Sequence, residues 1–250
     1  MADRFQGKAV LVAGGTGGLG RAVTLAFLNE GAAVHVTYRS EGEFTSLQSA
    51  AGQSAQSSSG LKEAPVIHRV APLYGHRADV TNEQQVTTLL EKFARIDVLV
   101  NTVGAYAGGT PLWQTGLDVY ERMMSQNVRS GFVLARAAVP LMLAQKSGLI
   151  VNISSRAAVD HAAGASAYAA SKAAAVAMMD SLAADVMGKG VRVNTVLPSI
   201  IDTAANRAAM PDADFSKWPK PEEIAQVILF LASEEAKLIH GASVPVYGTS

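Results

Sequence analysis

The chain has 250 residues, of which 49% are hydrophobic and 17% are charged, and its formal net charge is zero. This composition supplies a sizeable apolar core and excludes a disordered chain, while the lack of a basic excess argues against nucleic acid as a partner. There is no cysteine, which excludes a disulfide scaffold, a thiolate metal site and a cysteine nucleophile.

Short apolar runs alternate with segments of helical periodicity along the chain. In chain order, the expected elements are a strand at 8–14, a helix at 18–31, a strand at 32–38, a helix at 82–94, a strand at 96–104, a helix at 116–145, a strand at 148–155, a helix at 166–186, a strand at 191–198, a helix at 220–233 and a last strand at 242–248. Strands that alternate with helices pair in parallel through right-handed crossovers. The sequence therefore predicts an α/β fold, with a doubly wound sheet and helices on both of its faces.

Residues 41–65 interrupt this alternation. The segment EGEFTSLQSAAGQSAQSSSGLKEAP is rich in Ser, Gln, Ala and Gly. It can hold a weak helix followed by a loop, and we interpret it as a surface insertion that the fold tolerates. Residues 78–80 then end an expected third strand.

A glycine cluster, AGGTGGLGRAV at residues 13–23, joins the first expected strand to the first expected helix. Gly14, Gly18 and Gly20 follow a G-x-x-x-G-x-G pattern. Glycine lets the backbone turn tightly and approach a pyrophosphate, and the helix N-terminus offers N–H groups and a positive dipole end. A tight turn without a ligand is the alternative, but the flanking strand and helix favour a nucleotide site.

The expected helix at 166–186 is dominated by alanine, yet it carries Tyr168 and Lys172. Four residues make about one helical turn, so both side chains project from the same face. Each alone is compatible with an exposed amphipathic pair. A nearby ammonium would instead lower the pKa of a phenol by about 1–3 units from its ordinary ~10, so we expect Lys172 to bring the pKa of Tyr168 closer to neutral pH.

These motifs resemble those of the short-chain dehydrogenase/reductase family, in its shorter, non-extended branch. Tyr168-x-x-x-Lys172 is similar to the family's Y-x-x-x-K signature, and the glycine turn is similar to its T-G-x-x-x-G-x-G, with Ala13 in place of Thr. Residues 101–104, NTVG, resemble its N-N-A-G, and residues 197–203, LPSIIDT, resemble its P-G-x-x-x-T. The resemblance covers almost the whole chain. It implies a single Rossmann-type domain over 1–250, with a seven-stranded, mostly parallel sheet.

The resemblance also implies a catalytic tetrad. Ser155 lies thirteen residues before Tyr168, and Asn127 lies twenty-eight before Ser155, which matches the spacing of the family's Asn-Ser-Tyr-Lys set. Tyr168 would donate a proton to the substrate oxygen, and Ser155 would orient the carbonyl. Lys172 would tune the phenol and hold the nicotinamide ribose, while Asn127 would hold a water that links Lys172 to solvent.

The implied cofactor is a nicotinamide dinucleotide. The residues expected to contact it are Gly14, Thr16, Gly17, Gly18, Leu19, Gly20, Arg39, Asp79, Val80, Asn101, Gly104, Tyr168, Lys172, Ile201 and Thr203. Tyr38 stands where an acid would select NAD, and the guanidinium of the next residue suits a 2′-phosphate. We therefore expect NADP(H), with NAD(H) as the alternative.

Residues 204–219 fall where this family places its substrate lid. The segment is short, with Phe215 and Trp218 as expected exposed aromatics, which favours an open pocket for a 3-oxoacyl thioester or a general ketone. A homo-oligomer, tetramer or dimer, is implied as well. Two alternatives stay open, an NAD-dependent alcohol dehydrogenase and a cofactor-binding regulatory protein without turnover.

Other sequence features set further expectations. The five histidines lack ligand spacing, so no metal site is expected. No apolar run approaches the ~18 residues that span a bilayer, and no signal-peptide pattern precedes the glycines. We therefore expect a cytoplasmic protein without a membrane partner.

Overall fold

The computed structural model of the chain describes residues 4–57 and 71–249. Within them, one sheet contains β1 (Ala9–Ala13), β2 (Ala33–Tyr38), β3 (Leu73–Arg77), β4 (Val98–Asn101), β5 (Gly148–Ile153), β6 (Val191–Pro198) and β7 (Ser243–Val246). The strand order is β3-β2-β1-β4-β5-β6-β7, and each strand is parallel to its neighbours. The predicted doubly wound α/β fold is confirmed, and the seven-stranded sheet, predicted to be mostly parallel, is parallel at every pair.

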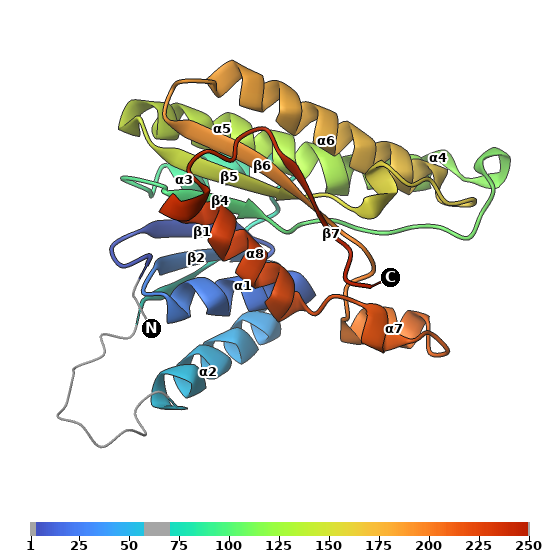
Figure 1. Cartoon of the computed structure of the whole chain (residues 1–250), viewed down its shortest axis with the longest axis horizontal. Coiled ribbons are helices and arrows are strands. Elements are labelled where there is room, and N and C mark those ends of the chain that lie inside the picture. The colour runs from blue at the N-terminus through green and yellow to red at the C-terminus, as the bar shows by residue number, and fades with distance from the viewer. Residues whose placement is uncertain (1–3, 58–70, 250) are drawn as a thin grey trace.

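Helices cover both faces of this sheet (Figure 1). One face carries α1 (Gly18–Asn29), α2 (Glu41–Ser57) and α8 (Pro221–Ala232), and the other carries α3 (Glu83–Leu90), α4 (Leu117–Met124), α5 (Ser130–Gln145) and α6 (Ser166–Val186). The short helical segments are η1 (Leu112–Gln114), the π-helical turn η2 (Ser125–Arg129), η3 (Arg156–Ala158), α7 (Ala204–Ala209), η4 (Phe215–Lys217) and η5 (Glu234–Ala236). None of the helices within the described ranges is long and apolar enough to cross a membrane.

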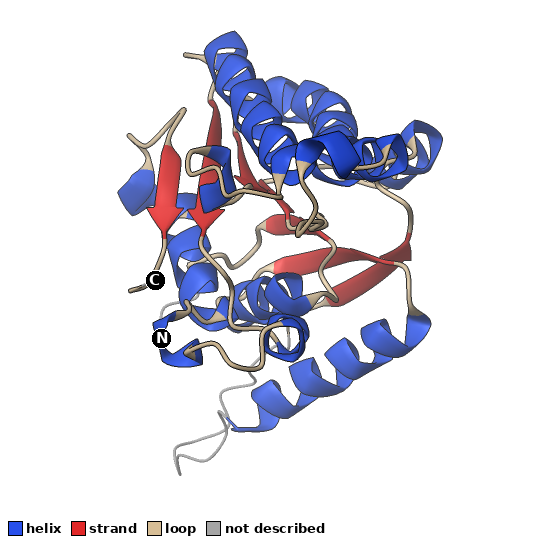
Figure 2. Ribbon diagram, turned by 90° about the vertical axis from the view of Figure 1, so that its right-hand side faces the viewer, coloured by secondary structure: helices blue, strands red, loops and turns tan. Residues whose placement is uncertain are grey.

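The core is divided into two layers by the sheet, which Figure 2 shows between its helices. Along β1, Val10 and Val12 belong to the apolar cluster shared with α1 and α8, whereas Leu11 and Ala13 belong to the cluster shared with α3, α5 and α6. Successive side chains of a strand point to opposite faces, so a strand that is buried on both faces must be apolar throughout. This explains why a central strand such as β1 is a continuous apolar run in the sequence.

The order of the strands reverses between β1 and β4. At this point the glycine turn after β1 meets the loop after β4, and the N–H of Thr102 donates to the carbonyl of Ala13 at 3.0 Å. Open parallel sheets bind their ligands at such a switch point, outside the carboxyl ends of the strands. Figure 1 places α7 and the loop between β4 and α4 at the same side of the molecule, to the right of the sheet.

The segment that we interpreted as a surface insertion is partly a core element. In α2, Phe44 and Leu47 are buried in the cluster that α1 and α8 also form. The ring of Phe44 lies so close to Gly75 of β3 that a Cβ atom there would approach it to 2.3 Å. Apolar residues at i and i+3 give α2 a stripe that faces the core, so the surface-insertion interpretation is wrong for its first turns. Residues 58–65 lie outside the described part of the chain.

Candidate active site

The four predicted catalytic side chains meet at the carboxyl edge of the sheet. Asn127 lies in the π-helical turn η2, and Ser155 follows β5. Tyr168 and Lys172 lie one turn apart in α6. The side chain of Ser155 is hydrogen-bonded to that of Tyr168. A Cβ atom on Gly104 would lie 2.9 Å from Asn127 Oδ1 and 3.1 Å from Lys172 Nζ, so these two atoms flank one glycine and require it.

Asn127 is held by a turn that departs from the α-helix. The helix predicted over 116–145 is divided by η2, and π-helical turns are frequent at functional sites. Asn127 Oδ1 accepts from the N–H of Ala105 at 2.8 Å, and Nδ2 donates to the carbonyl of the same residue at 3.0 Å. Nδ2 also donates to the Ser171 hydroxyl at 2.9 Å. These partners fix the orientation of a side chain that is buried.

Lys172 is a buried amine on the inner face of α6. Its Nζ donates to the carbonyl oxygen of Ile153 at 3.2 Å and lies 5.9 Å from the centre of the Tyr168 ring. Burial disfavours the charged form and lowers the pKa of Lys172 to about 8. The group therefore titrates close to neutral pH.

The pKa of Tyr168 is raised above its ordinary value of 10.0, chiefly because burial disfavours the phenolate. The hydrogen bond with Ser155 opposes this shift, and the neighbouring Tyr106 adds to it. The prediction that Lys172 lowers the pKa of Tyr168 is therefore wrong. The amine is itself buried and donates to Ile153, and it loses its charge near pH 8.

Two serines directly follow β5, and their side chains have different partners. The hydroxyl of Ser154 is buried and donates to the carbonyl of Lys172 at 2.9 Å, which fastens the strand to α6. Ser155 Oγ accepts from the N–H of Ala157 at 3.2 Å and is hydrogen-bonded to Tyr168. Of the two, Ser155 is the one that reaches the phenol.

Sequence reasoning missed two side chains that contact this group. Ser171 is fully buried, accepts from Asn127 and donates to the carbonyl of Tyr168 at 2.7 Å. A hydroxyl directly before Lys172 in an alanine-rich helix was a signal for it. Tyr106 places its ring 4.9 Å from that of Tyr168, at an angle of 77°. No spacing in the sequence marks Tyr106, because it lies in an irregular loop.

The glycine turn is packed so closely that side chains cannot be added at its key positions. A Cβ atom on Gly20 would lie 2.1 Å from the carbonyl oxygen of Gly14, and Gly14 itself has a φ of +74°. Gly17 precedes the first turn of α1 with extended backbone. Because the first N–H groups of a helix have no partner within it, this bare backbone forms a cradle that fits a pyrophosphate.

A threonine from a neighbouring strand and another from a loop brace this turn. Thr37 Oγ1 accepts from the N–H of Gly14 at 2.9 Å, and the Thr102 hydroxyl donates to the carbonyl of Ala13 at 2.7 Å. Ala13 itself lacks the hydroxyl found at this position in the family motif. The two neighbouring hydroxyls supply the bracing that the alanine cannot.

The other predicted cofactor residues divide into two groups. Thr203 packs on the turn, since a Cβ atom on Gly18 would lie 2.9 Å from its methyl carbon. The side chains of Leu19, Val80 and Asn101 are buried in the interior. Only the backbone of these three residues is available to contact a ligand.

Arg39, which we predicted to recognise a 2′-phosphate, is exposed but already has partners. Its guanidinium lies 3.4 Å from a carboxylate oxygen of Asp79 and donates to Gln126 Oε1 at 3.2 Å. Burial alone would raise the pKa of Asp79, but hydrogen bonds from Thr81 together with Arg39 hold it below its ordinary value. A bound phosphate would compete with Asp79 for the guanidinium.

The first turn of α2 brings carboxylates to the same end of the site. The Thr16 hydroxyl of the glycine turn donates to Glu43 Oε2 at 2.9 Å. The hydroxyl of Tyr38 donates to Glu41 Oε2 at 2.8 Å. This end of the site therefore offers both an arginine and carboxylate acceptors to a ligand.

In the segment 204–219, predicted as a lid, one arginine contacts residues both before and after it in the chain. Arg207 pairs with Asp202 through two hydrogen bonds of 2.5 and 2.7 Å, and its guanidinium lies 4.8 Å from the centre of the Phe215 ring. Trp218 is 6% exposed, so the prediction of an exposed aromatic is wrong there. Its ring packs 5.0 Å from the half-buried Phe215 instead.

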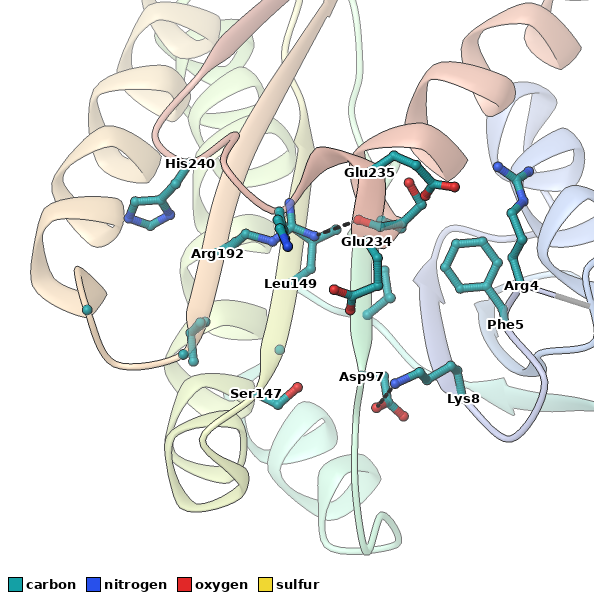
Figure 3. Close-up of a pocket in the computed structure, with 18 of the residues that line it drawn as sticks. Arg4, Phe5, Lys8, Asp97, Ser147, Leu149, Arg192, Glu234, Glu235 and His240 are labelled. Atoms are coloured by element: carbon teal, nitrogen blue, oxygen red, sulfur yellow. Dashed lines mark hydrogen bonds and ion pairs between the residues drawn. The ribbon is translucent and has the colours of Figure 1, made fainter.

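A hollow of about 580 Å³ lies at the opposite, amino edge of the sheet (Figure 3). Lys8, Asp97 and Ser147, which directly precede β1, β4 and β5, border it together with Arg192. Lys8 Nζ lies 3.6 Å from the Asp97 carboxylate, and Arg192 donates to backbone carbonyls around the end of α8. These charged groups are engaged in holding the fold, and the hollow is separate from the tetrad.

No group of three or more His, Asp or Glu in the described residues could hold a metal ion.

The chain is similar to known proteins over most of its length. The model of the short chain dehydrogenase family matches residues 8–214. The chain is 33% identical to the 3-oxoacyl-[acyl-carrier-protein] reductase FabG of Thermotoga maritima, over 98% of both chains.

Solved structures share the fold over nearly the whole chain. The crystal structure of gox2181 matches with a TM-score of 0.87 at 26% identity, covering 98% of this chain and 96% of that one. A short-chain dehydrogenase/reductase from Serratia marcescens BCRC 10948 matches with a TM-score of 0.84 at 30% identity, covering 99% and 100%.

Proposed function

Because the chain belongs to the short-chain dehydrogenase/reductase family, we propose that it interconverts a ketone and a secondary alcohol with NADP(H). The relatives are named as reductases and dehydrogenases, so the protein is an oxidoreductase that acts on CH–OH groups. One observation carries the proposal for the site: Ser155 is hydrogen-bonded to Tyr168 beside the buried amine of Lys172.

Tyr168 is the proton donor in this proposal. Reduction of a carbonyl develops negative charge on its oxygen, so a proton must arrive there. Because its pKa is raised, the Tyr168 phenol is protonated at neutral pH and carries the proton that the substrate oxygen needs. Ser155 shares a hydrogen bond with the phenol, so its hydroxyl would bind the same substrate oxygen and orient it.

Lys172 and Asn127 would return a proton to Tyr168. An amine that titrates near pH 8 can both release and accept a proton at neutral pH. Asn127 Oδ1 and Lys172 Nζ flank Gly104, where the amide would hold a water that connects the amine to solvent. Lys172 would also hold the hydroxyls of the nicotinamide ribose.

The glycine turn supports a dinucleotide as the cofactor. Its bare backbone from Gly14 to Gly20 would hold the pyrophosphate, with Thr203 packed against it. The guanidinium of Arg39 would bind the 2′-phosphate and would give up its ion pair with Asp79. When bound, NADPH would supply a hydride, a hydrogen with its electron pair, from its nicotinamide ring for the reduction.

One observation favours a second candidate, an NAD(H)-dependent alcohol dehydrogenase. Glu43 contacts the glycine turn through Thr16, at the end of the site where the adenosine would lie. A carboxylate accepts hydrogen bonds from ribose hydroxyls and repels a phosphate. Arg39 and Glu43 therefore favour opposite cofactors, and their substitution separates the two candidates.

We infer a 3-oxoacyl thioester or a similar ketone as the substrate. The relative from Thermotoga maritima is named for that reaction and covers 98% of the chain. The short lid of 204–219 leaves room for a long or carrier-bound chain. We also infer a single cofactor-binding domain, located in the cytoplasm. The exposed apolar side chains of Leu117 in α4 and Phe132 in α5 support a homo-oligomer.

The decisive experiment follows the oxidation of NADPH and of NADH by the purified protein. The panel contains acetoacetyl and longer 3-oxoacyl thioesters, quinones, sugars and steroid ketones. Turnover of at least one class with NADPH, at a higher kcat/KM than with NADH, is the expected result. Cofactor binding without turnover of any class would support the regulatory alternative instead.

A further inference from the structure

The proposed mechanism gives no role to Tyr106, although the ring of Tyr106 packs against that of Tyr168, the proposed proton donor. The centres of the Tyr106 and Tyr168 rings are 4.9 Å apart and the rings meet at 77°. Edge-to-face contact is a favoured arrangement for two aromatic rings. Tyr106 is nevertheless 68% exposed, so most of its surface faces solvent beside the active site.

The backbone on either side of Tyr106 fixes this position. The preceding residue, Ala105, exchanges two hydrogen bonds with the buried amide of Asn127. Two residues after Tyr106, a Cβ atom on Gly108 would lie 2.2 Å from the Tyr106 hydroxyl oxygen. The chain thus turns back beside the Tyr106 hydroxyl, and a side chain at 108 would displace the Tyr106 ring from this position.

The loop that carries Tyr106 is also tied to the segment before α6. The N–H of Thr110 donates to the carbonyl of Gly164 at 3.3 Å, two residues before the helix begins. Gly164 has a φ of +74°, which favours glycine at that position. The loop after β4 is therefore joined to the segment before α6, and Tyr106 belongs to a tethered loop beside Tyr168.

We propose that Tyr106 is a specificity-determining residue whose exposed ring holds the apolar group that flanks the substrate carbonyl. This inference rests on the proposed function, because it needs Tyr168 to meet the carbonyl oxygen. A substrate oxygen that reaches Tyr168 brings its flanking group beside the neighbouring ring. Apolar contact with that ring stabilises flat or extended apolar groups and gives little to small ones.

The test uses two methyl ketones that differ in one phenyl ring, benzylacetone and butanone. Steady-state kinetics with NADPH are measured for the wild type, Tyr106→Phe and Tyr106→Ala. We expect Tyr106→Ala to raise KM for benzylacetone about tenfold, the upper range of one aromatic contact, with kcat within a few-fold. KM for butanone should change little, and Tyr106→Phe should keep the wild-type ratio of the two ketones.

Trp113→Ala is the matched control, since Trp113 lies on the same loop and is 81% exposed. If Trp113→Ala and Tyr106→Ala change the ratio of the two ketones equally, the loop as a whole sets selectivity and the proposal is overturned. An unchanged ratio in Tyr106→Ala overturns it as well. A change confined to Tyr106→Ala supports it.

A titration that needs no turnover separates this inference from the proposed function. The ultraviolet absorbance of the six tyrosines is followed against pH, and Tyr168→Phe identifies the contribution of that residue. Because Tyr106 raises the pKa of Tyr168, Tyr106→Phe should move that contribution to lower pH. If the wild type reduces neither ketone, the proposed function fails for these substrates. The titration then tests by itself whether Tyr106 lies against Tyr168. An unmoved titration then overturns the inference.

Discussion

The amine of Lys172 and the carbonyl oxygen of Ile153 lie 3.2 Å apart, which ties the lysine of α6 to the last residue of β5. This contact holds the amine in the interior, 5.9 Å from the centre of the Tyr168 ring. Burial consequently governs both groups, since it lowers the pKa of Lys172 and raises that of Tyr168. In both cases burial shifts the equilibrium toward the neutral form.

Lys172→Met should stabilise the folded protein at pH 7 while abolishing turnover. The pKa of Lys172 is about 8 in the folded protein and 10.5 ordinarily, so the folded state resists the charged form. This penalty is complete below about pH 8 and disappears as pH rises toward 10.5. We expect a gain in unfolding free energy on the order of 1–3 kcal/mol at pH 7, shrinking above pH 8. Urea unfolding at pH 7 and pH 10 measures it, and a variant less stable than wild type at pH 7 would show that the contact with Ile153 outweighs burial.

Gly20→Ala should destabilise the glycine turn, and Gly17→Ala is its matched control. A Cβ atom on Gly20 would lie 2.1 Å from the carbonyl oxygen of Gly14, so the backbone must move. On Gly17 it would lie 3.5 Å from the same oxygen, an ordinary contact. We expect Gly20→Ala to cost about 1–3 kcal/mol and lower Tm by several degrees, with Gly17→Ala close to wild type. Thermal unfolding at equal protein concentration checks this, and equal Tm values for the two variants would contradict it.

The stability of the protein should fall as pH falls from about 6.5 to about 4, partly because of His35. His35 Nδ1 lies 3.0 Å from His76 Nε2, and the centre of its ring lies 4.5 Å from that of Tyr74 and 4.4 Å from that of Phe93. Burial, with the charge of His76 second, lowers the pKa of His35 to about 4. Within this window the unfolded chain binds a proton that the folded protein excludes, so stability is present above the window and is lost through it.

Urea unfolding at pH 7, 5.5 and 4.5 tests the role of His35. His35→Phe keeps an aromatic ring against its neighbours and removes the titrating group, so the loss of stability toward acid should be smaller than in the wild type. His161→Phe, at an exposed loop position, is the control and should keep the wild-type loss. If His35→Phe keeps it as well, other groups cause the acid sensitivity.

Substitution of Arg39 and Glu43 should shift cofactor preference in opposite directions. Arg39→Ala removes the guanidinium that would bind a 2′-phosphate, and we expect about tenfold weaker NADPH binding with little change for NADH. Glu43→Gln removes the carboxylate beside Thr16 and should improve NADPH binding. Calorimetric titration of both cofactors into the wild type and the two variants gives the six affinities. A preference that neither substitution moves would remove these residues from cofactor selection.

Local patterns in the sequence predicted the alternation of strands and helices, and the family resemblance added the sheet and the candidate tetrad. The apolar run of β1 and the glycines that follow predict a strand, a tight turn and a helix, because each signal is carried by adjacent residues. The spacing of Tyr168 and Lys172 similarly places both on one side of α6, because helical geometry is regular over a turn. Their assigned roles stay proposals until activity is measured.

The features that sequence reasoning missed depend on contacts between distant segments. The pKa of Tyr168 is set by how deeply α6 packs on β5, which no local pattern contains. Phe44 is buried because Gly75 of β3 leaves room for its ring, and that glycine lies far along the chain. Trp218 is buried for a comparable reason, since it packs against Phe215.

The central claim, that Tyr168 donates the proton, is tested most directly by Tyr168→Phe. The variant keeps the ring that packs against Tyr106 and removes only the hydroxyl. The measurement is kcat/KM for the best ketone of the panel with NADPH, together with NADPH affinity by titration. We expect kcat/KM to fall by about 10²–10⁴-fold while the affinity stays within a few-fold of wild type. A kcat/KM within tenfold of wild type would contradict the assignment.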